Sequence, residues 1–335
     1  MPSEENPASP VGSEAPDGLT TSAGRNPEGS RPGDEAGGRE TEAVDGPAPG
    51  EGGWPAGRRR GTGPFITFVE YERPDGLVAQ WESRRQRKQR DPQATGSGGT
   101  WWAPRARGWW IGVLFAVGSI LFALGAVPGY AELAGTRADS ITFFVGSLFF
   151  TSAGFLQYRE SVDAGSSVLP HGLRRVFSYL PRQIDWWASG VQLVGTLYFN
   201  ISTADAVREN LSAQAAQHHV WRPDAIGSVC FLVASGLAWF EVCHGWVAWS
   251  PRSISWWITL LNLVGSIAFG VSAVASYIVP ATGQLRNVEL SNLGTFVGAL
   301  CFLIGAILLL PERTEETEVA VAASGSPPPA RSSGT

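Results

Sequence analysis

Carboxylates and guanidinium groups recur at fixed positions around the apolar segments of the sequence. A glutamate lies fourteen residues after the glycine of each of three Gly-[Ser/Ala]-x-x-Phe motifs, and an arginine precedes each of three Trp-Trp pairs. We expect both sets at the same membrane face. The predicted ion pairs, within or between helical hairpins, are Arg105–Glu160, Arg182–Glu241 and Arg252–Glu312. Alternatively all six are solvated at headgroup level, where an exposed pair contributes about 0–1 kcal/mol.

Two histidines are candidates for proton transfer or metal binding near these glutamates. His171 opens the segment before the second Trp-Trp copy, and His244 occupies the matching place before the third. An imidazole changes charge near neutral pH and its nitrogen binds metals, so both roles suit it. The commoner role of such residues is that of a polar group in a loop or at a helix end.

Two amides lie inside apolar segments at equivalent positions. Gln192 and Asn262 each come six residues after the first Trp of a Trp-Trp pair, where Phe115 stands in the first copy. A polar side chain at depth in a membrane marks a solute pathway or a hydrogen bond between helices, of which the hydrogen bond is commoner. Both are therefore candidate intramembrane polar residues.

The sequence carries no recognisable catalytic, metal-binding or cofactor-binding signature. Its three cysteines, Cys230, Cys243 and Cys301, form no CxxC pair and no dense framework, so neither a disulfide nor a zinc site is predicted. The sequence therefore favours a protein without enzymatic activity. A membrane enzyme would require the glutamates and histidines to converge at one face, within hydrogen-bond reach of about 3 Å.

Six apolar segments are long enough to cross a membrane. A hydrocarbon core of about 30 Å needs roughly 20 helical residues, and a range of about 17–25 is tolerated. None of the six carries a charged residue at its centre. They cover approximately residues 109–127, 141–157, 186–203, 225–241, 256–279 and 291–310. The sequence thus predicts an all-α membrane protein with six transmembrane helices.

Arginine placement predicts how these helices are oriented. The basic cluster at 84–90 precedes the first helix, and the loop between the second and third helices is richer in arginine than the loops after the odd helices. Cytoplasmic flanks carry the excess of basic residues, so both termini are expected in the cytoplasm of a cell membrane. The basic cluster is expected to bind anionic lipid headgroups. The abundance of Gly, Ala and Arg suggests a GC-rich, bacterial genome.

One pattern, P-R-x3-W-W-x7-G-[ST]-x2-F, introduces every odd helix. It begins at Pro104, Pro181 and Pro251. Proline fits just outside a helix or in its first turn, tryptophan pairs anchor helix ends at the interface, and a glycine beside a small hydroxyl allows close helix approach. The pattern predicts three tandem two-helix hairpin repeats.

The expected domain boundaries follow from this repeat and from composition. Residues 1–63 and 313–335 are rich in small and polar residues and are expected to be disordered tails. Residues 64–100 form a cytoplasmic juxtamembrane segment in which Leu77 to Arg90 is predicted as a basic helix. The hairpins occupy 101–160, 161–241 and 242–312. The second begins with an amphipathic connector carrying Leu173, Val176, Phe177 and Leu180 at helical spacing.

The last hairpin, 256–312, carries the motifs Gly265-Ser266-Ile-Ala-Phe269 and Gly298-Ala299-Leu-Cys-Phe302. In these motifs it resembles the small YrhK-like bacterial membrane domain. The resemblance implies a two-helix unit and no particular activity.

Besides the membrane enzyme considered above, two functions stay open on the sequence alone. The first is a structural or interaction module of the cytoplasmic membrane, whose tails recruit a protein partner that the sequence does not identify. The second is a small-solute transporter or channel with a pathway along the axis between the hairpins. A wide polar cavity would favour the second function, and a packed axis would count against it. The basic cluster lacks a recognisable nucleic-acid-binding motif, so no nucleic acid is expected.

Overall fold

The computed structural model describes residues 44–45, 56–72, 78–89, 101–165, 178–208 and 211–324. Most of the described chain is helical. The amphipathic connector falls largely in 166–177, outside the described residues, as does His171.

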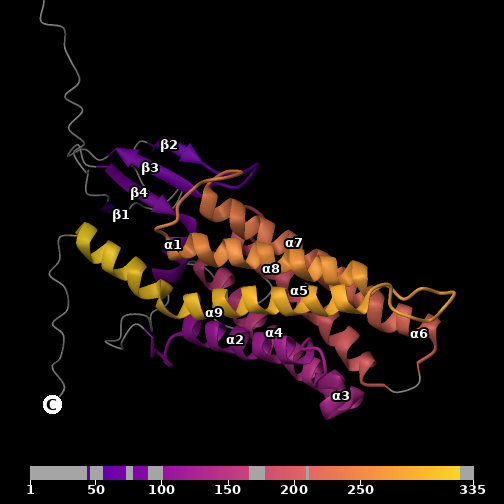
Figure 1. The fold of residues 1–335 in the computed structure, drawn as a ribbon. Coiled ribbons are helices and arrows are strands. Elements are labelled where there is room, and N and C mark those ends of the chain that lie inside the picture. Colours follow the sequence, from indigo (N-terminus) through magenta and orange to yellow (C-terminus); the bar gives the residue numbers. More distant parts are fainter. Residues whose placement is uncertain are drawn as a thin grey trace, which may run out of the picture. The chain divides into compact units, whose positions relative to one another are not determined.

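Six long helices pack side by side (Figure 1), and the contacts between them close into a ring. They are α2 (Arg107–Gly125), α4 (Thr136–Gly165), α5 (Ile184–Ala206), α7 (Arg222–Cys243), α8 (Ile254–Ala275) and α9 (Val288–Ser324). Each packs mainly against the helices before and after it, and α9 closes the ring against α2. Short helical pieces, α3 (Tyr130–Ala134), α6 (Ala213–Ala216) and the π-helix Gln217–Trp221, lie between α2 and α4 and between α5 and α7.

Glycines let the two helices of each pair approach closely. A Cβ atom added to Gly118 of α2 would lie 2.7 Å from the Phe150 ring of α4, and one added to Gly146 of α4 would lie 2.8 Å from the Phe122 ring of α2. The same reciprocal contact joins α5 to α7 and α8 to α9, through Gly195 with Gly227 and Gly265 with Gly298. Such backbone proximity strengthens van der Waals packing between helices that lie in lipid.

Six phenylalanines fill the centre of the ring, one from each long helix. They are Phe122, Phe150, Phe199, Phe231, Phe269 and Phe302, with 1–6% of their surface exposed. Neighbouring ring centroids lie 5.1–6.4 Å apart, within the range of favourable aromatic pairs. The axis is therefore packed at this level.

Hydroxyl groups join neighbouring helix pairs. Ser147 of α4 bonds Thr203 of α5 at 2.9 Å, and nearer the other end Ser161 bonds Ser189 at 2.8 Å. Ser235 of α7 bonds Ser266 of α8 at 2.6 Å. These side chains are buried, so each pair satisfies polar groups that neither lipid nor the apolar core can satisfy.

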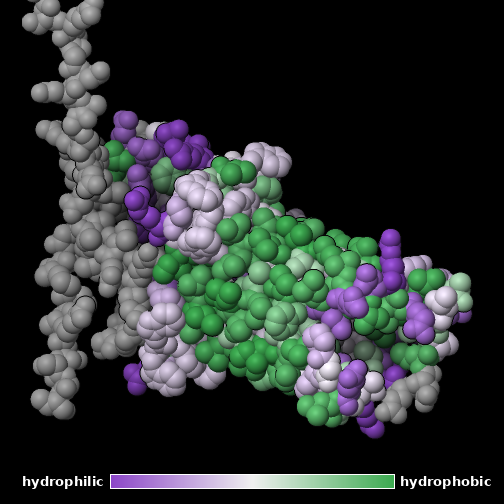
Figure 2. Space-filling view, in the orientation of Figure 1, coloured by the Kyte–Doolittle hydropathy of each residue, from purple (hydrophilic) through white to green (hydrophobic). Residues whose placement is uncertain are grey.

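The outside of the helices is apolar over much of their length (Figure 2). Figure 2 shows a broad hydrophobic band with paler and hydrophilic residues at both ends. Five helical segments are long and apolar enough to cross a membrane: Arg107–Gly125, Thr136–Ala164, Ala213–Cys243, Ile254–Ala275 and Val288–Glu312. This is the pattern of a membrane-embedded helical protein. Helix α5, predicted as a span at 186–203, is not among the five.

A small sheet and a short helix precede the long helices. Strands β1 (Val44–Asp45), β2 (Ala56–Arg60), β3 (Phe68–Glu72) and β4 (Val78–Glu82) pair in the order β1-β4-β3-β2, and α1 (Ser83–Gln89) follows β4. Val69, Tyr71 and Ala79 form the core on one face of the sheet. We call residues 56–72 and 78–89 the cap.

The described strands and helices correct three sequence-based boundaries. The helix predicted from Leu77 is wrong over 78–82, because β4 pairs antiparallel with β3 along its whole length. Strands β1 and β2 lie inside the predicted N-terminal tail, 1–63. At the other end α9 continues to Ser324, so the helix extends into the segment predicted as a C-terminal tail, 313–335.

Candidate functional site

The residues that could do chemistry meet where α1 contacts one end of the helix ring. Arg84, Arg87 and Lys88 lie at i, i+3 and i+4, so they share one face of α1. Arg84 and Lys88 are buried despite their charge. Each of the three contacts a glutamate on a different long helix, as described below.

Arg84 binds the glutamate of α9. Its Nε and Nη2 donate to Glu312 Oε1 at 2.8 and 2.7 Å, and Ser255 of α8 donates to the same oxygen at 2.8 Å. Glu312 is 1% exposed. The carboxylate is thus held by a cation from the cap and a hydroxyl from the first turn of α8.

Arg87 binds two carboxylates. Its Nη1 and Nη2 donate to Glu241 Oε1 and Oε2 of α7 at 3.0 and 3.3 Å, and its Nη1 lies 3.0 Å from Asp185 Oδ2 of α5. Ser83, the first residue of α1, also donates to Glu241 Oε1 at 2.8 Å. Burial opposes the charge of Arg87, but the nearby Glu241 and Asp185 outweigh it and raise the guanidinium pKa well above its ordinary value.

Lys88 binds the remaining glutamate. Its Nζ lies 3.3 Å from both carboxylate oxygens of Glu160 on α4, and 3.8 Å from Glu312 Oε2. All of these groups are at least nine-tenths buried. A buried charge that loses its partner costs about 3–5 kcal/mol, so the pairs hold the cap and the helix ring in one arrangement.

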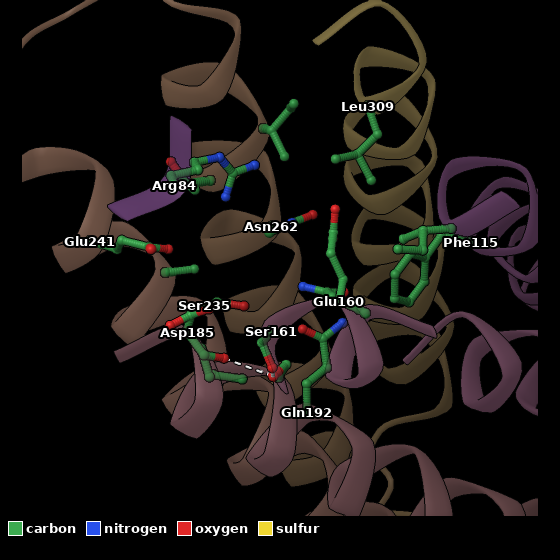
Figure 3. Close-up of a pocket in the computed structure, with 18 of the residues that line it drawn as sticks. Arg84, Phe115, Glu160, Ser161, Asp185, Gln192, Ser235, Glu241, Asn262 and Leu309 are labelled. Carbon is green, nitrogen blue, oxygen red and sulfur yellow. Dashed lines mark hydrogen bonds between the residues drawn. The ribbon is translucent and has the colours of Figure 1, made fainter. Parts of the chain in front are cut away.

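A polar cavity lies between α1 and the phenylalanine cluster. Its volume is about 60 Å³, which is large enough to hold water. Amide and hydroxyl side chains line its walls, and Ile111, Phe115 and Phe302 contribute apolar lining. Figure 3 shows Glu160, Gln192 and Asn262 gathered around the same space.

The structure brings most of the sequence-predicted site residues to this cavity. Glu160, Glu241, Gln192 and Asn262 line it, and Glu312 lies against Lys88 beside it. Gln192 and Asn262 come from α5 and α8, as their equivalent positions in the sequence indicate. All three glutamates are ion-paired, but with basic residues of α1.

The predicted partners of these glutamates are wrong. Arg105, Arg182 and Arg252 are exposed, and no ion pair joins them to a glutamate among the described residues. Each of these arginines follows a proline outside the first turn of its helix, whereas the glutamates turn toward the centre of the ring. The basic side chains of α1 reach that centre, whereas the exposed Arg105, Arg182 and Arg252, at the outer edge of the ring, do not.

His244 has a structural role in the described region. It ends α7 in the left-handed conformation, with a φ of 49°. Its Nδ1 lies 3.0 Å from Thr67 Oγ1, its ring packs on Phe68, and its Nε2 is 3.7 Å from Glu82 Oε1. The imidazole therefore joins α7 to the cap. Within the described ranges, no three His, Cys, Asp or Glu side chains lie close enough together to hold a metal ion.

Six residues of the site are not among the sequence-predicted site residues: Ser83, Asp185 and Ser255, and Arg84, Arg87 and Lys88 on one face of α1. The spacing of Arg84, Arg87 and Lys88 was a usable signal, since three cations on one helix face require acidic partners or solvent. Asp185 occupies a variable position of the Pro-Arg-x3-Trp-Trp motif, so the repeat does not single it out. No protein-family model, curated protein or solved structure matches this chain.

Proposed function

We propose that this protein is a multi-pass interaction module of the cytoplasmic membrane, in which the helix ring anchors the cap at the membrane surface. The observation that carries the proposal is the set of buried ion pairs between α1 and glutamates of α4, α7 and α9. Three cations of α1 make this one internal contact, and together they hold the cap firmly against the helix ring. The cap would then present its exposed residues to a protein partner.

Six spans, not five, fit this arrangement best. Helix α5 has 23 residues, or about 34 Å at 1.5 Å per residue, which is enough for a hydrocarbon core. Its lower hydropathy comes from polar residues such as Gln192 and Thr196 that turn inward, while Val194, Leu197 and Ile201 are exposed on its outer side. A helix at an equivalent place in the ring has the same lipid neighbours as the other five.

Three tandem hairpin repeats are supported by a hydrogen bond that occurs in each copy. The second Trp donates its indole N–H to the carbonyl of the proline six residues earlier, at 2.9 Å from Trp110, 3.2 Å from Trp187 and 2.9 Å from Trp257. The reciprocal glycine contacts also occur once per pair. The resemblance of the third hairpin to YrhK-like domains agrees with a two-helix unit.

A cytoplasmic location for both termini is supported by the basic residues at the cap end. Arg105, Arg182 and Arg252 are exposed there, and so are Arg58 to Arg60 on β2. Cytoplasmic flanks carry such an excess, and each basic residue near an anionic surface contributes about 1 kcal/mol to lipid binding. We infer that anionic headgroups surround the cap end of the ring.

A channel or transporter along the axis is the weaker candidate. The polar cavity favours it, because Gln192 and Asn262 face that space. The six-phenylalanine cluster opposes it, because the rings fill the centre of the bundle and leave the cavity without a polar continuation through that cluster. Transport would require these rings to separate.

Cleavage of the full-length protein tests the anchoring function. A site-specific protease sequence inserted between residues 90 and 101 allows the cap to be cut from the ring in isolated membranes. We expect the wild-type cap to stay with the membranes during a high-salt wash, which screens binding to lipid headgroups. In the variant Glu160→Gln/Glu241→Gln/Glu312→Gln the cap should pass into the supernatant.

A second variant gives the matched control. Arg105→Gln/Arg182→Gln/Arg252→Gln removes three charges from the same end of the ring without touching the buried pairs, so its cap should be retained. Each variant is first checked for an unchanged size-exclusion profile in detergent. Release of the wild-type cap as readily as that of the glutamine variant would overturn the proposal.

A further inference from the structure

We propose that the outer edge of β2 binds an acidic, extended segment of a protein partner, which adds to the sheet of the cap as a further strand. This inference rests on the proposed function, because it names the kind of partner that the anchored cap would bind. Two independent observations carry it: the open edge of the sheet, and the charge of the strand at that edge.

Strand β2 forms one edge of the sheet, whose strand order is β1-β4-β3-β2, and Figure 1 shows it as the outermost strand of the cap. It pairs antiparallel with β3 on one side and with no described strand on the other. The carbonyl of Arg60 accepts a hydrogen bond from the Thr67 N–H at 3.0 Å, so it faces the sheet. Backbone groups alternate in direction along a strand, and those of Arg59 therefore face the open side. Such an edge is a template for pairing with another strand.

The strand at this edge carries three consecutive arginines, Arg58, Arg59 and Arg60, and all three are exposed. Among the described residues, no ion pair joins them to a carboxylate. Arg59 stands opposite Val69 and Arg60 opposite Phe68, so their side chains lie on opposite faces of the sheet. The guanidinium carbon of Arg60 lies 5.7 Å from the centre of the Phe68 ring. A strand added here would therefore meet positive charge on both of its faces.

These charges count against a second copy of β2 as the occupant of the edge. Like charges on directly opposite residues of paired strands are destabilising, whereas opposite charges stabilise the pair. Guanidinium groups also bind carboxylates through two parallel hydrogen bonds. Charged side chains protect a sheet edge from aggregation, and the same side chains select which strand can pair with it. The complementary occupant is an extended segment with acidic side chains at successive positions.

The backbone of the edge distinguishes a polypeptide from anionic lipid. A peptide strand supplies both N–H and C=O groups, and main-chain hydrogen bonds provide the affinity when a strand is added to a sheet. The phosphate groups of lipids accept hydrogen bonds but donate none to the open C=O groups. The edge therefore favours a polypeptide, and lipid is the alternative that the experiment separates from it.

Peptide binding to the full-length protein in phosphatidylcholine nanodiscs tests the proposal. The probe is the peptide acetyl-Thr-Val-Glu-Glu-Glu-Val-Thr, fluorescently labelled at its C-terminus, whose palindromic sequence suits either strand direction. Fluorescence anisotropy should show saturable binding of about one peptide per chain, weakened by high salt. The same peptide N-methylated at its glutamates keeps the charge but loses amide donors on both of its edges. It should bind at least about tenfold more weakly, because each lost hydrogen bond contributes to affinity.

A triple variant and a matched control test the charge of β2. Arg58→Gln/Arg59→Gln/Arg60→Gln should bind the peptide at least about tenfold more weakly than the wild type, because the opposite-charge pairs across the strands are lost. The control, which removes the same number of exposed charges from the cap end of the ring and should bind as the wild type does, is Arg105→Gln/Arg182→Gln/Arg252→Gln.

Two single variants separate the backbone of β2 from its charge. Arg59→Gln and Arg59→Pro both remove the guanidinium group, and only the proline also removes the N–H on the open side. An edge strand tolerates proline at such a position. Arg59→Pro should therefore bind the peptide several times more weakly than Arg59→Gln, and equal binding by the two would show that the edge does not pair.

Three further results would overturn the inference. The first is the absence of saturable binding to the folded wild type, and the second is equal binding of the N-methylated peptide. The third is abolition of binding, at physiological ionic strength, when phosphatidylglycerol replaces phosphatidylcholine, which would assign the arginines of β2 to lipid headgroups. Each result leaves the anchoring test unaffected, since that test measures retention of the cap and not peptide binding.

Discussion

Removal of Arg87 should release the cap more than any other single change in α1. Arg87 pairs with Glu241 and Asp185 at once, through contacts of 3.0–3.3 Å. The variant Arg87→Gln leaves both buried carboxylates without their cation, and only Ser83 still donates to Glu241. Breaking a buried pair in this way costs about 3–5 kcal/mol. At about 1.4 kcal/mol per factor of ten, the population with an undocked cap should rise about 100- to 4,000-fold.

Trypsin reports this population directly, because α1 contains Arg84, Arg85 and Lys88 as remaining cleavage sites. Arg84 and Lys88 are buried in the docked cap. When docking and undocking are faster than cleavage, the cleavage rate follows the open population. Mass spectrometry of the fragments from detergent-solubilised protein should therefore show cutting after Arg84 and Lys88 at least a hundredfold faster in Arg87→Gln.

Arg252→Gln is the control for this experiment, since Arg252 is exposed and lies outside the buried network. Its cleavage pattern within α1 should match that of the wild type. If Arg87→Gln is cut within twofold of the wild-type rate, the buried pairs do not hold the cap and the energetic reasoning is wrong. If Arg252→Gln is cut as fast as Arg87→Gln, the rim arginines are the partners that matter.

Three further changes test the ring and its junction with the cap. Gly118→Ala places a methyl group 2.7 Å from the aromatic ring of Phe150. Such overpacking should lower the free energy of unfolding of the helix ring by about 1–3 kcal/mol, measured by chemical denaturation. The control Gly236→Ala should leave it unchanged, because a Cβ atom added there meets no atom within 4 Å. Phe231→Ala removes a ring that is 1% exposed from the central cluster and should cost about 3–5 kcal/mol by the same measurement. Burial lowers the pKa of His244, an effect that Arg60 strengthens and Glu241 opposes. With the cap undocked, the imidazole regains its ordinary pKa of about 6.5 and binds more protons than it does in the docked state. Cap docking should therefore weaken as the pH falls below about 6.5. Trypsin cleavage of α1 at pH 5.5 and 7.5 should show this dependence, and His244→Asn should reduce it; an unchanged slope in the variant would assign the effect to other groups.

The cap was the hardest part to predict from sequence. Residues 78–82 are Val-Ala-Gln-Trp-Glu, which a helix accommodates as well as a strand, so the sequence alone predicts one helix through this segment and the basic residues that follow. Pairing with β3 decides the matter, since backbone hydrogen bonds to another segment outweigh weak local preference. The short β2, Ala56–Arg60, carries three arginines in a region rich in glycine and proline, and its composition resembles that of a tail.

The sequence predicts the carboxylates and amides of the site but not the cations that bind them. The recurrence of Glu160, Glu241 and Glu312 identified the carboxylates, and matching positions identified Gln192 and Asn262. Three arginines share the periodicity of the glutamates, but the basic cluster that binds the glutamates occurs once and lies outside the repeat. A partner that is not repeated leaves no periodic signal in the sequence. Lys88 and Arg84 reach their glutamates because α1 packs on the ring end, which is a tertiary contact.

The sequence by itself determined the apolar helices, because the hydrocarbon thickness requires about 20 apolar residues in each span. It also determined the glycine and phenylalanine positions, because close packing needs small residues opposite large ones at a fixed register. Only the tertiary structure decided which charges meet. Ion pairing depends on distances of 3–4 Å between segments far apart in the chain, such as Arg84 and Glu312, and no local pattern encodes that distance.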